Sequence, residues 1–140
     1  TQAIRSERIG MGASAVAKLP AVRQALLQRQ RNFLTAQGLV ADGRDMGSTV
    51  FPEAQLKIFL TASAQIRAER RAKQIGVPLD GAAFAQILAD IQARDAADRS
   101  RPVAPLQQLP DAKLLDTSHR SIEETVQQVL DWYHASPKAA

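Results

Sequence analysis

The stretch Leu39–Gly47, with the sequence LVADGRDMG, sets the fold class of this chain. Its leading apolar residues predict a short buried strand over 39–41, which ends at a glycine-flanked turn with two carboxylates around one arginine. A turn of this kind at a strand end is where an α/β sheet gathers ligands. One interpretation of these residues is a substrate-binding loop, with Arg44 on a phosphate, Asp45 accepting hydrogen bonds from a base or sugar, and Asp42 near a magnesium shell. A solvated turn with a local Asp–Arg pair is the alternative.

Helices and further strands are predicted on both sides of this stretch. Apolar residues at helical spacing predict a helix over 4–19, and after the break at Pro20 a second helix over 21–36. The second helix ends at Gly38. A strand is predicted over 56–60, followed by a helix over 64–74 capped by Ser63 and a helix over 81–99 capped by Asp80. The last two elements are a strand over 113–115 and a helix that reaches Trp132 or Tyr133. This final helix starts at a capping box of Ser121 and Glu124.

Strands that alternate with helices predict a three-layer α/β fold with a parallel sheet. The carboxyl ends of the strands, where Asp42 to Asp45 and Asp116 to Ser118 lie, are the expected ligand edge. Three strands are few for a parallel sheet that is covered on both faces, so we expect an open flank.

Composition bounds the size of the chain and the nature of its partners. Its 140 residues suffice for one domain, and 45% are apolar but only six are aromatic, so the core must come mainly from Ala, Leu, Val and Ile. Arginine provides 13 of the 18 basic residues, which face 14 acidic ones. Because the planar arginine fork suits phosphate, this bias points to a phosphate-bearing partner, with ordinary surface charge as the alternative.

Several classes of protein are disfavoured. The chain has no cysteine, so it can form neither a disulfide nor a cysteine-based metal site, and its two histidines are too few for a zinc site. No apolar run approaches the roughly 18 residues that span a bilayer, and the N-terminus lacks the zones of a signal peptide. We expect a soluble, cytoplasmic protein that does not bind membranes.

A second group of charged residues lies on either side of a turn that contains glycine and proline. Arg67 and Arg71 are one helical turn apart and share a face, as do Arg94, Asp98 and Arg101 if the helix continues that far. Arginines on a closing lid can position phosphates and neutralise their charge during phosphoryl transfer. Surface ion pairs with neighbouring acidic residues, each worth under about 1 kcal/mol, are the alternative.

One pattern is absent from the chain. No Gly-x-x-x-x-Gly-Lys followed by Ser or Thr occurs in the 140 residues, so they encode no backbone cradle for an ATP triphosphate. No catalytic triad is indicated either, and a metal or acid–base role is not favoured for His119 or His134.

Over nearly its whole length the chain resembles bacterial cytidylate kinase. The DGRDMG loop, followed by VFP and KIFL, is a specific signature, and the later RDxxDRxR makes a chance match improbable. The segments that carry the resemblance are Ile4–Ser6, Ala17–Arg23, Leu26–Arg31, Asp42–Gly47, Val50–Pro52, Lys57–Leu60, Arg67 with Arg70 and Arg71, Arg94 with Asp95, and Asp98–Arg101.

The resemblance implies roles for individual residues. Those implied to bind CMP are Ser14, Arg23 and Asp45 on the cytosine, Arg44 and Arg101 on the α-phosphate, and Arg94 and Asp98 on the sugar; Arg44, Arg94 and Arg101 are also implied to be catalytic. Arg67, Arg70 and Arg71 are implied to belong to a lid over the ATP phosphates, and Asp42 to help hold hydrated magnesium.

The implied activity is ATP-dependent phosphorylation of CMP and dCMP, with Mg²⁺ accompanying the ATP. The implied fold is that of the P-loop nucleoside monophosphate kinases, with the P-loop strand expected to precede Thr1. Residues 1–140 are then a single partial domain with a lid-like helical segment over about 63–101. We expect the chain alone to be inactive, the whole protein to be a monomer, and the fragment to dimerise or swap segments.

Two alternatives remain open. One is a non-catalytic module that binds nucleotides or assembles with itself. A basic RNA-binding domain is weaker, because the chain has no aromatic stacking platform and no lysine-rich stripe, and no nucleic-acid partner is expected.

Overall fold

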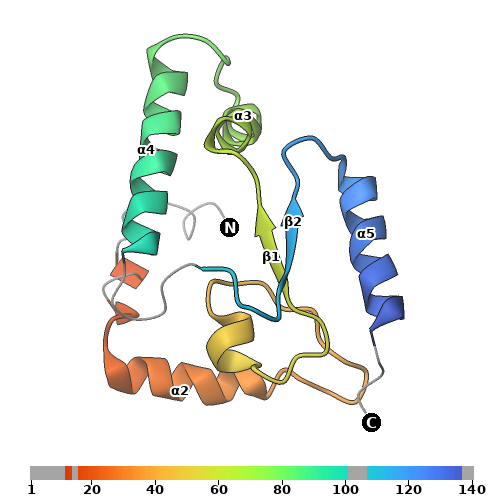
Figure 1. Ribbon diagram of the computed structural model, residues 1–140. Coiled ribbons are helices and arrows are strands. Elements are labelled where there is room, and N and C mark those ends of the chain that lie inside the picture. Colours follow the sequence, from red (N-terminus) through yellow and green to blue (C-terminus); the bar gives the residue numbers. More distant parts are fainter. Residues whose placement is uncertain (1–11, 14–15, 101–106, 137–140) are drawn as a thin grey trace. The chain divides into compact units, whose positions relative to one another are not determined.

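The computed structural model of the chain describes residues 12–13, 16–100 and 107–136 (Figure 1). Most of the helix predicted over 4–19 lies outside the described residues, as do the candidate site residues Ser14 and Arg101. The chain divides into two compact units, Thr1–Phe51 and Pro52–Ala140. A single domain over residues 1–140 stays a prediction.

The first unit is built on helix α2, Pro20–Arg31. Pro20 opens the helix, as predicted, because the first position needs no backbone N–H and favours the φ angle that proline fixes. The helix ends five residues before the predicted Ala36. The N–H groups of Phe33 and Leu34 donate to carbonyls three residues back, which tightens the chain out of the α-helix.

The strand predicted over 39–41 is not formed. An apolar run becomes a strand only where a neighbouring strand takes up its backbone hydrogen bonds, and within the described residues none pairs with this segment. Val40 is instead fully exposed. The segment follows a bridge between Thr35 and Gly38, where a φ of 94° at the glycine turns the chain.

The DGRD turn leads into a π-helical turn, η2, over Met46–Val50. The carbonyl of Asp45 accepts hydrogen bonds from the N–H groups of both Thr49 (2.9 Å) and Val50 (3.2 Å), and Phe51 donates to Met46 across five residues. Single π turns of this kind are frequent at functional sites.

The second unit contains the sheet. Strand β1, Ile58–Thr61, pairs in parallel with strand β2, Lys113–Asp116, so that Thr61 lies opposite Asp116. The parallel arrangement is as predicted, but the described residues form two strands where three were expected. Among the described residues, Leu115 on β2 is the largest side chain that is almost completely buried.

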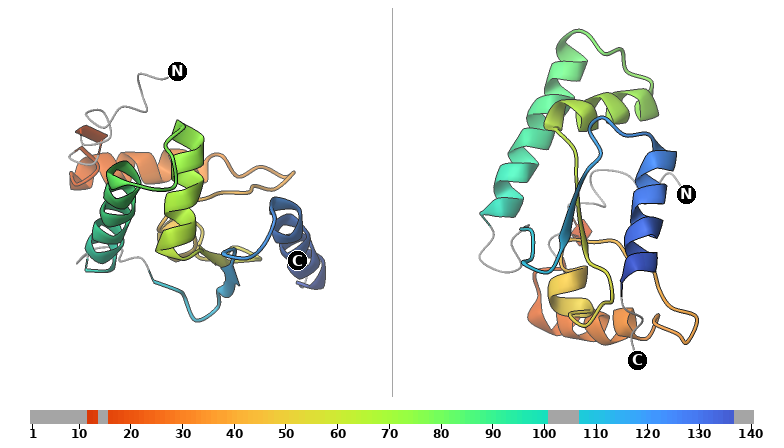
Figure 2. Two further views of the ribbon diagram at one scale, coloured as in Figure 1. Left: turned by 90° about the horizontal axis from the view of Figure 1, so that it is seen from above. Right: turned by 45° about the vertical axis from the view of Figure 1, so that its right-hand side comes forward.

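Helix α3, Ala64–Ile75, follows β1 directly. Ser63 caps it as predicted, since its Oγ accepts a hydrogen bond from the N–H of Ile66 at 3.2 Å. Gly76 ends it in the left-handed conformation, with a φ of 74°, which glycine adopts without strain. In Figure 2, α3 runs across the carboxyl end of β1 and lies against α4.

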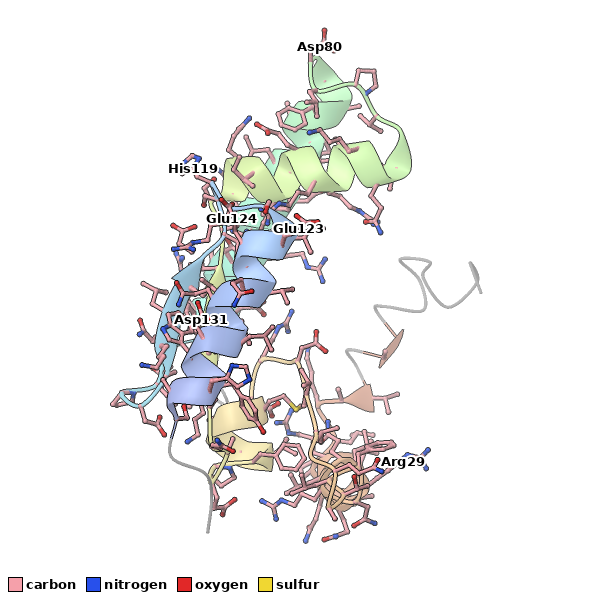
Figure 3. The ribbon with its side chains drawn as sticks, turned by 90° about the vertical axis from the view of Figure 1, so that its right-hand side faces the viewer. Arg29, Asp80, His119, Glu123, Glu124 and Asp131 are labelled. Atoms are coloured by element: carbon pink, nitrogen blue, oxygen red, sulfur yellow. The ribbon has the colours of Figure 1, made fainter. Side chains whose placement is uncertain are left out.

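Helix α4, Ala82–Arg99, packs on α3. The contact is close because Ala68 and Ala72, one turn apart on α3, are fully buried. The cap predicted at Asp80 is wrong. Gly81 is the N-cap residue, with a φ of 89° that disfavours any other residue, and Asp80 lies at the tip of the α3–α4 turn, pointing away from the helices (Figure 3).

Helix α5, Ile122–Ala135, begins at the predicted capping box of Ser121 and Glu124 and extends two or three residues beyond the predicted end at Trp132 or Tyr133. It runs back alongside β2 (Figure 1), and the Lys113 ammonium lies 5.6 Å from the centre of the Trp132 ring. In the parts of the chain that the structure describes, no helix combines the length and the apolar character needed to cross a membrane.

Candidate functional site

Arg23 and Asp45 meet in the first unit. The Arg23 Nη2 donates to Asp45 Oδ2 at 3.2 Å, which joins α2 to the DGRD turn across 22 residues. The Arg23 side chain is 42% exposed and that of Asp45 is 23% exposed, so both are open to a ligand. The structure therefore brings together two of the three residues that the sequence assigns to the cytosine.

Arg31 holds the same turn in place from the other end of α2. Its Nε donates to the carbonyl of Val50 and its Nη2 to that of Thr49, both at 3.0 Å. Two hydrogen bonds from one rigid guanidinium fix the orientation of η2 against the helix. Sequence reasoning did not single out Arg31 for this role. The available signal was an arginine in the last turn of a helix followed by a polar loop.

Asp42 and Arg44 are exposed on the turn between α2 and η2. The turn is tight, because a Cβ atom added at Gly43 would lie 3.0 Å from the Cε of Met46. Among the described residues, no three or more His, Asp or Glu side chains converge as a metal site. The single exposed carboxylate of Asp42 fits a contact to hydrated Mg²⁺ carried by phosphates, because that ion keeps several waters and needs few protein ligands.

Arg67 and Asp95 meet in the second unit and join α3 to α4. The Arg67 Nη1 donates to Asp95 Oδ1 at 2.8 Å, and Nη2 donates to Oδ2 at 2.5 Å, so the pair is bidentate. The Arg67 Nε also donates to the carbonyl of Ala62, at the end of β1, at 3.0 Å. The hydrogen bond from the guanidinium lowers the pKa of Asp95, and the same bond raises the pKa of Arg67.

The other two predicted lid arginines have different surroundings. Arg70 reaches the end of β2, where its Nη2 donates to the carbonyl of Thr117 at 2.6 Å and its Nη1 to the hydroxyl at 3.1 Å. That hydroxyl donates in turn to the carbonyl of Thr61 on β1. Arg71 is exposed and donates to Gln74 on its own helix at 2.9 Å. The three arginines therefore do not share one ligand-facing position.

Arg94 and Asp98 lie one turn apart on α4, as the sequence predicted. Arg94 is exposed, whereas Asp98 is only 9% exposed and is the most buried charged side chain among the described residues. A buried carboxylate is costly unless it is paired, so Asp98 lies in an environment quite different from that of the exposed Arg94 one turn before it.

An open cleft of about 460 Å³ lies between the start of α3 and the second half of α4, at the carboxyl ends of the strands. Its lining includes Thr61, Ser63, Arg67, Gln92, Asp95 and Arg99. At its edge, Ser118 donates two hydrogen bonds to Asp116, which lower the pKa of that carboxyl. The cleft occupies the edge where an α/β sheet is expected to gather ligands.

Parallel strands connected by helices define this chain as an α/β protein, and the cleft at the ends of its described strands is lined in part by arginines. Residues 1–135 match the family model for cytidylate kinase, and the chain belongs to the cytidylate kinase family. That membership implies the fold of the P-loop nucleoside monophosphate kinases.

Curated relatives support the same family. Over 130 residues the chain is 74% identical to a cytidylate kinase of Neisseria meningitidis serogroup C, a match that covers 93% of the chain and 60% of the relative. It is 62% identical over 133 residues to that of Chromobacterium violaceum (95% and 60%) and 61% identical over 131 residues to that of Saccharophagus degradans (93% and 58%). The chain spans about 60% of the length of the curated relatives it matches.

Proposed function

We propose that this chain forms the CMP-binding and lid part of an ATP-dependent cytidylate kinase that phosphorylates CMP and dCMP. The observation that carries the proposal is the contact between Arg23 and Asp45, two positions that match the family motifs and meet across 22 residues of chain. The cytosine edge offers an amino donor beside acceptors, and a carboxylate beside a guanidinium complements it. Uracil presents a carbonyl where cytosine has its amino group, so the same pair disfavours UMP. Ser14 is proposed to complete this recognition.

The phosphate and sugar of CMP are assigned to other arginines. Arg44 and Arg101 hold the α-phosphate, and Arg94 with Asp98 contacts the sugar. Each guanidinium offers several fixed donors and stays positive at every working pH, which suits a dianionic phosphate. In their catalytic role Arg44, Arg94 and Arg101 neutralise charge that spreads over the phosphoryl oxygens during transfer.

The proposed reaction is a direct in-line transfer. An oxygen of the CMP α-phosphate forms a bond to the γ-phosphorus of ATP, the bond from that phosphorus to the β-phosphate oxygen breaks, and the products are CDP and ADP. The attacking oxygen is already ionised, so the residues on this chain need to orient the two nucleotides rather than accept a proton. Mg²⁺ bound to ATP would supply charge neutralisation at the β- and γ-phosphates, and Asp42 is the proposed contact to its water shell.

Helices α3 and α4, with the turn between them, are proposed as the lid, in agreement with the predicted segment over 63–101. Arg67, Arg70 and Arg71 all lie on α3. Closing such a segment over ATP would bring positive charge to the phosphates and exclude water that would otherwise hydrolyse them.

The test is a coupled assay of ADP formation on the full protein encoded by the reading frame that contains this sequence. We expect ADP formation to depend on CMP and dCMP, with much slower turnover of UMP and AMP. Absence of CMP-dependent turnover, or equal rates with UMP, would overturn the proposal. The 140-residue chain alone is expected to be inactive in the same assay, because its sequence has no GxxxxGK[ST] segment.

A second candidate, self-assembly of the chain, is favoured by one observation. Leu60 on β1 is 63% exposed and Leu114 on β2 is 53% exposed, so the described two-stranded sheet leaves large apolar side chains in contact with water. Light scattering of the isolated chain distinguishes the two cases: a concentration-dependent dimer supports assembly, and a monomer that binds CMP in calorimetry supports the kinase assignment alone.

A further inference from the structure

We propose that Asp95 is a positioning residue for the CMP-binding side of α4, and that Arg67 serves as its partner rather than as a ligand of the ATP phosphates. The inference rests on the proposed function and deepens it, because it separates the three lid arginines by role. Asp95 itself has no role in the sequence-based assignment.

Every nitrogen of the Arg67 guanidinium is already engaged. Nη1 and Nη2 donate to the two oxygens of Asp95, and Nε donates to the carbonyl of Ala62. A phosphate could bind Nη1 and Nη2 of this guanidinium only by displacing the Asp95 carboxylate, because both anions need the same two parallel N–H donors. The geometry therefore favours a fixed structural contact over a ligand contact.

These bonds tie three elements together at one point. Ala62 follows the last residue of β1, Arg67 lies in the first turns of α3, and Asp95 lies in the second half of α4. Ala68 and Ala72 bring the helices close, but apolar contact is non-directional and by itself specifies the rotation of α4 less strictly than a directional bond does. A bidentate ion pair has one preferred geometry, so it fixes the rotation of α4 about its axis.

The rotation of α4 decides where its substrate residues point. Successive residues of an α-helix are separated by about 100°, so a small rotation or a shift by one residue redirects every side chain. Arg94 directly precedes Asp95, and Asp98 follows it by three residues. Losing the pair would therefore misplace two groups assigned to CMP without removing either of them, and misplacement by about 1 Å can cost on the order of 100-fold in rate.

Arg71 offers the matching contrast on the same helix. It lies one turn after Arg67, is exposed, and its only hydrogen bond among the described residues is to Gln74 three residues along the helix. Such a local contact is easily exchanged for a phosphate. Arg71 is therefore the arginine on α3 that we assign to ATP.

The experiment is a kinetic double-mutant cycle on the full protein, with Arg67→Gln, Asp95→Asn and the double variant, and with Arg71→Gln as the matched control. For CMP we expect each single variant to lower kcat/KM about 10-fold and the double variant to be no worse than either, since both remove one shared contact. The KM for ATP should stay within about two-fold of wild type in these three variants and rise about 10-fold in Arg71→Gln.

Two results would overturn the inference. One is a raised KM for ATP in Arg67→Gln that Asp95→Asn does not share, and the other is an independent, multiplicative loss in the double variant. If Arg67→Gln does not fold, Asp95→Asn still decides, because it retains an acceptor and should lower kcat/KM for CMP while leaving the KM for ATP unchanged. A wild-type protein without CMP turnover rejects the proposed function itself, whereas an active wild type with an additive cycle rejects only the positioning role.

Discussion

The two units each contain an arginine–aspartate pair that joins distant parts of the chain, and the pairs differ in geometry rather than in burial. The Asp45 and Asp95 side chains are both 23% exposed, and the Arg23 and Arg67 side chains are 42% and 37% exposed. One pair has a single hydrogen bond of 3.2 Å, whereas the other has two of 2.8 and 2.5 Å and a third bond from the same guanidinium to a carbonyl.

Exposure alone would assign both pairs the same role. The number of donors already engaged separates them, because a guanidinium with one long contact can turn to a ligand while one with three short contacts cannot do so without a loss. We infer that the contact between Arg23 and Asp45 can be replaced by hydrogen bonds from each residue to a nucleotide base. The pair of Arg67 and Asp95, by contrast, holds α3 and α4 together.

The largest loss of activity is expected from a substitution at Asp45. Asp45→Ala should lower kcat/KM for CMP by about 100-fold, because a charged acceptor for the cytosine amino group is lost, and should change the free energy of unfolding by less than about 1 kcal/mol. Steady-state kinetics and urea unfolding of the full protein measure both. Asp80→Ala, at the tip of the α3–α4 turn, is the matched control and should alter neither. A stability loss at Asp45 with intact kinetics contradicts the proposed role.

The converse is expected at Asp95, where stability is affected first. Asp95→Ala leaves the half-buried Arg67 without its carboxylate and should lower the free energy of unfolding by about 1–2 kcal/mol, after allowance for the solvent that reaches both groups. Asp90→Ala on the same helix, where the carboxylate is exposed and accepts a hydrogen bond from Gln86, should cost less than about 0.5 kcal/mol. Equal losses in urea unfolding for the two variants would show that the ion pair is not a structural contact.

The parts of the fold that could be predicted from sequence are those set by local chemistry. Ser63 caps α3, Gly76 ends it in the left-handed conformation, and the capping box of Ser121 and Glu124 opens α5, because each motif needs only residues within a few positions. The parallel pairing of the two described strands also followed from the alternation of strands and helices.

The predictions that failed depend on residues far along the chain or on competition between neighbours. The strand over 39–41 was wrong because apolar character cannot supply a hydrogen-bonding neighbour. Asp80 was a reasonable cap by type, but Gly81 takes the position with its positive φ.

For the candidate site, periodicity gave the shared face of Arg67 and Arg71 but not the partner of either. The match between Arg67 and Asp95 spans 28 residues and depends on how α3 crosses α4. Arg31 was missed for the same reason, since its acceptors are backbone carbonyls of η2 that carry no mark in the sequence.

A smaller effect is expected from pH. Because Arg67 lowers the folded-state pKa of Asp95, the pair contributes stability above the unfolded aspartate pKa of about 3.9, and this contribution disappears as pH falls through the lower folded value. The Asp95→Asn variant should therefore lose less stability than wild type as pH falls from about 5 to about 2.5, in unfolding measured against pH. Hydrogen bonds from Lys57 to Asp111 and from Ser118 to Asp116 also lower the pKa of those carboxyl groups. Part of the loss of stability in acid should therefore persist in the variant. Parallel pH profiles for the two proteins would contradict this role of Asp95.

The smallest effect is expected for the energetic coupling between Arg23 and Asp45. A double-mutant cycle with Arg23→Gln and Asp45→Asn, measured by urea unfolding without nucleotide, should give a coupling free energy below about 0.5 kcal/mol, because one 3.2 Å contact between partly exposed groups is largely offset by solvation and side-chain entropy. The same cycle on Arg67 and Asp95 should give at least about 1 kcal/mol, since the bidentate geometry fixes both side chains. With saturating CMP the coupling of the first pair should rise, because both groups then share a ligand, while that of the second stays constant. Equal coupling free energies in the two cycles without nucleotide would contradict this distinction. The number of hydrogen bonds in each pair would then not tell a ligand-binding pair from a structural one in this chain.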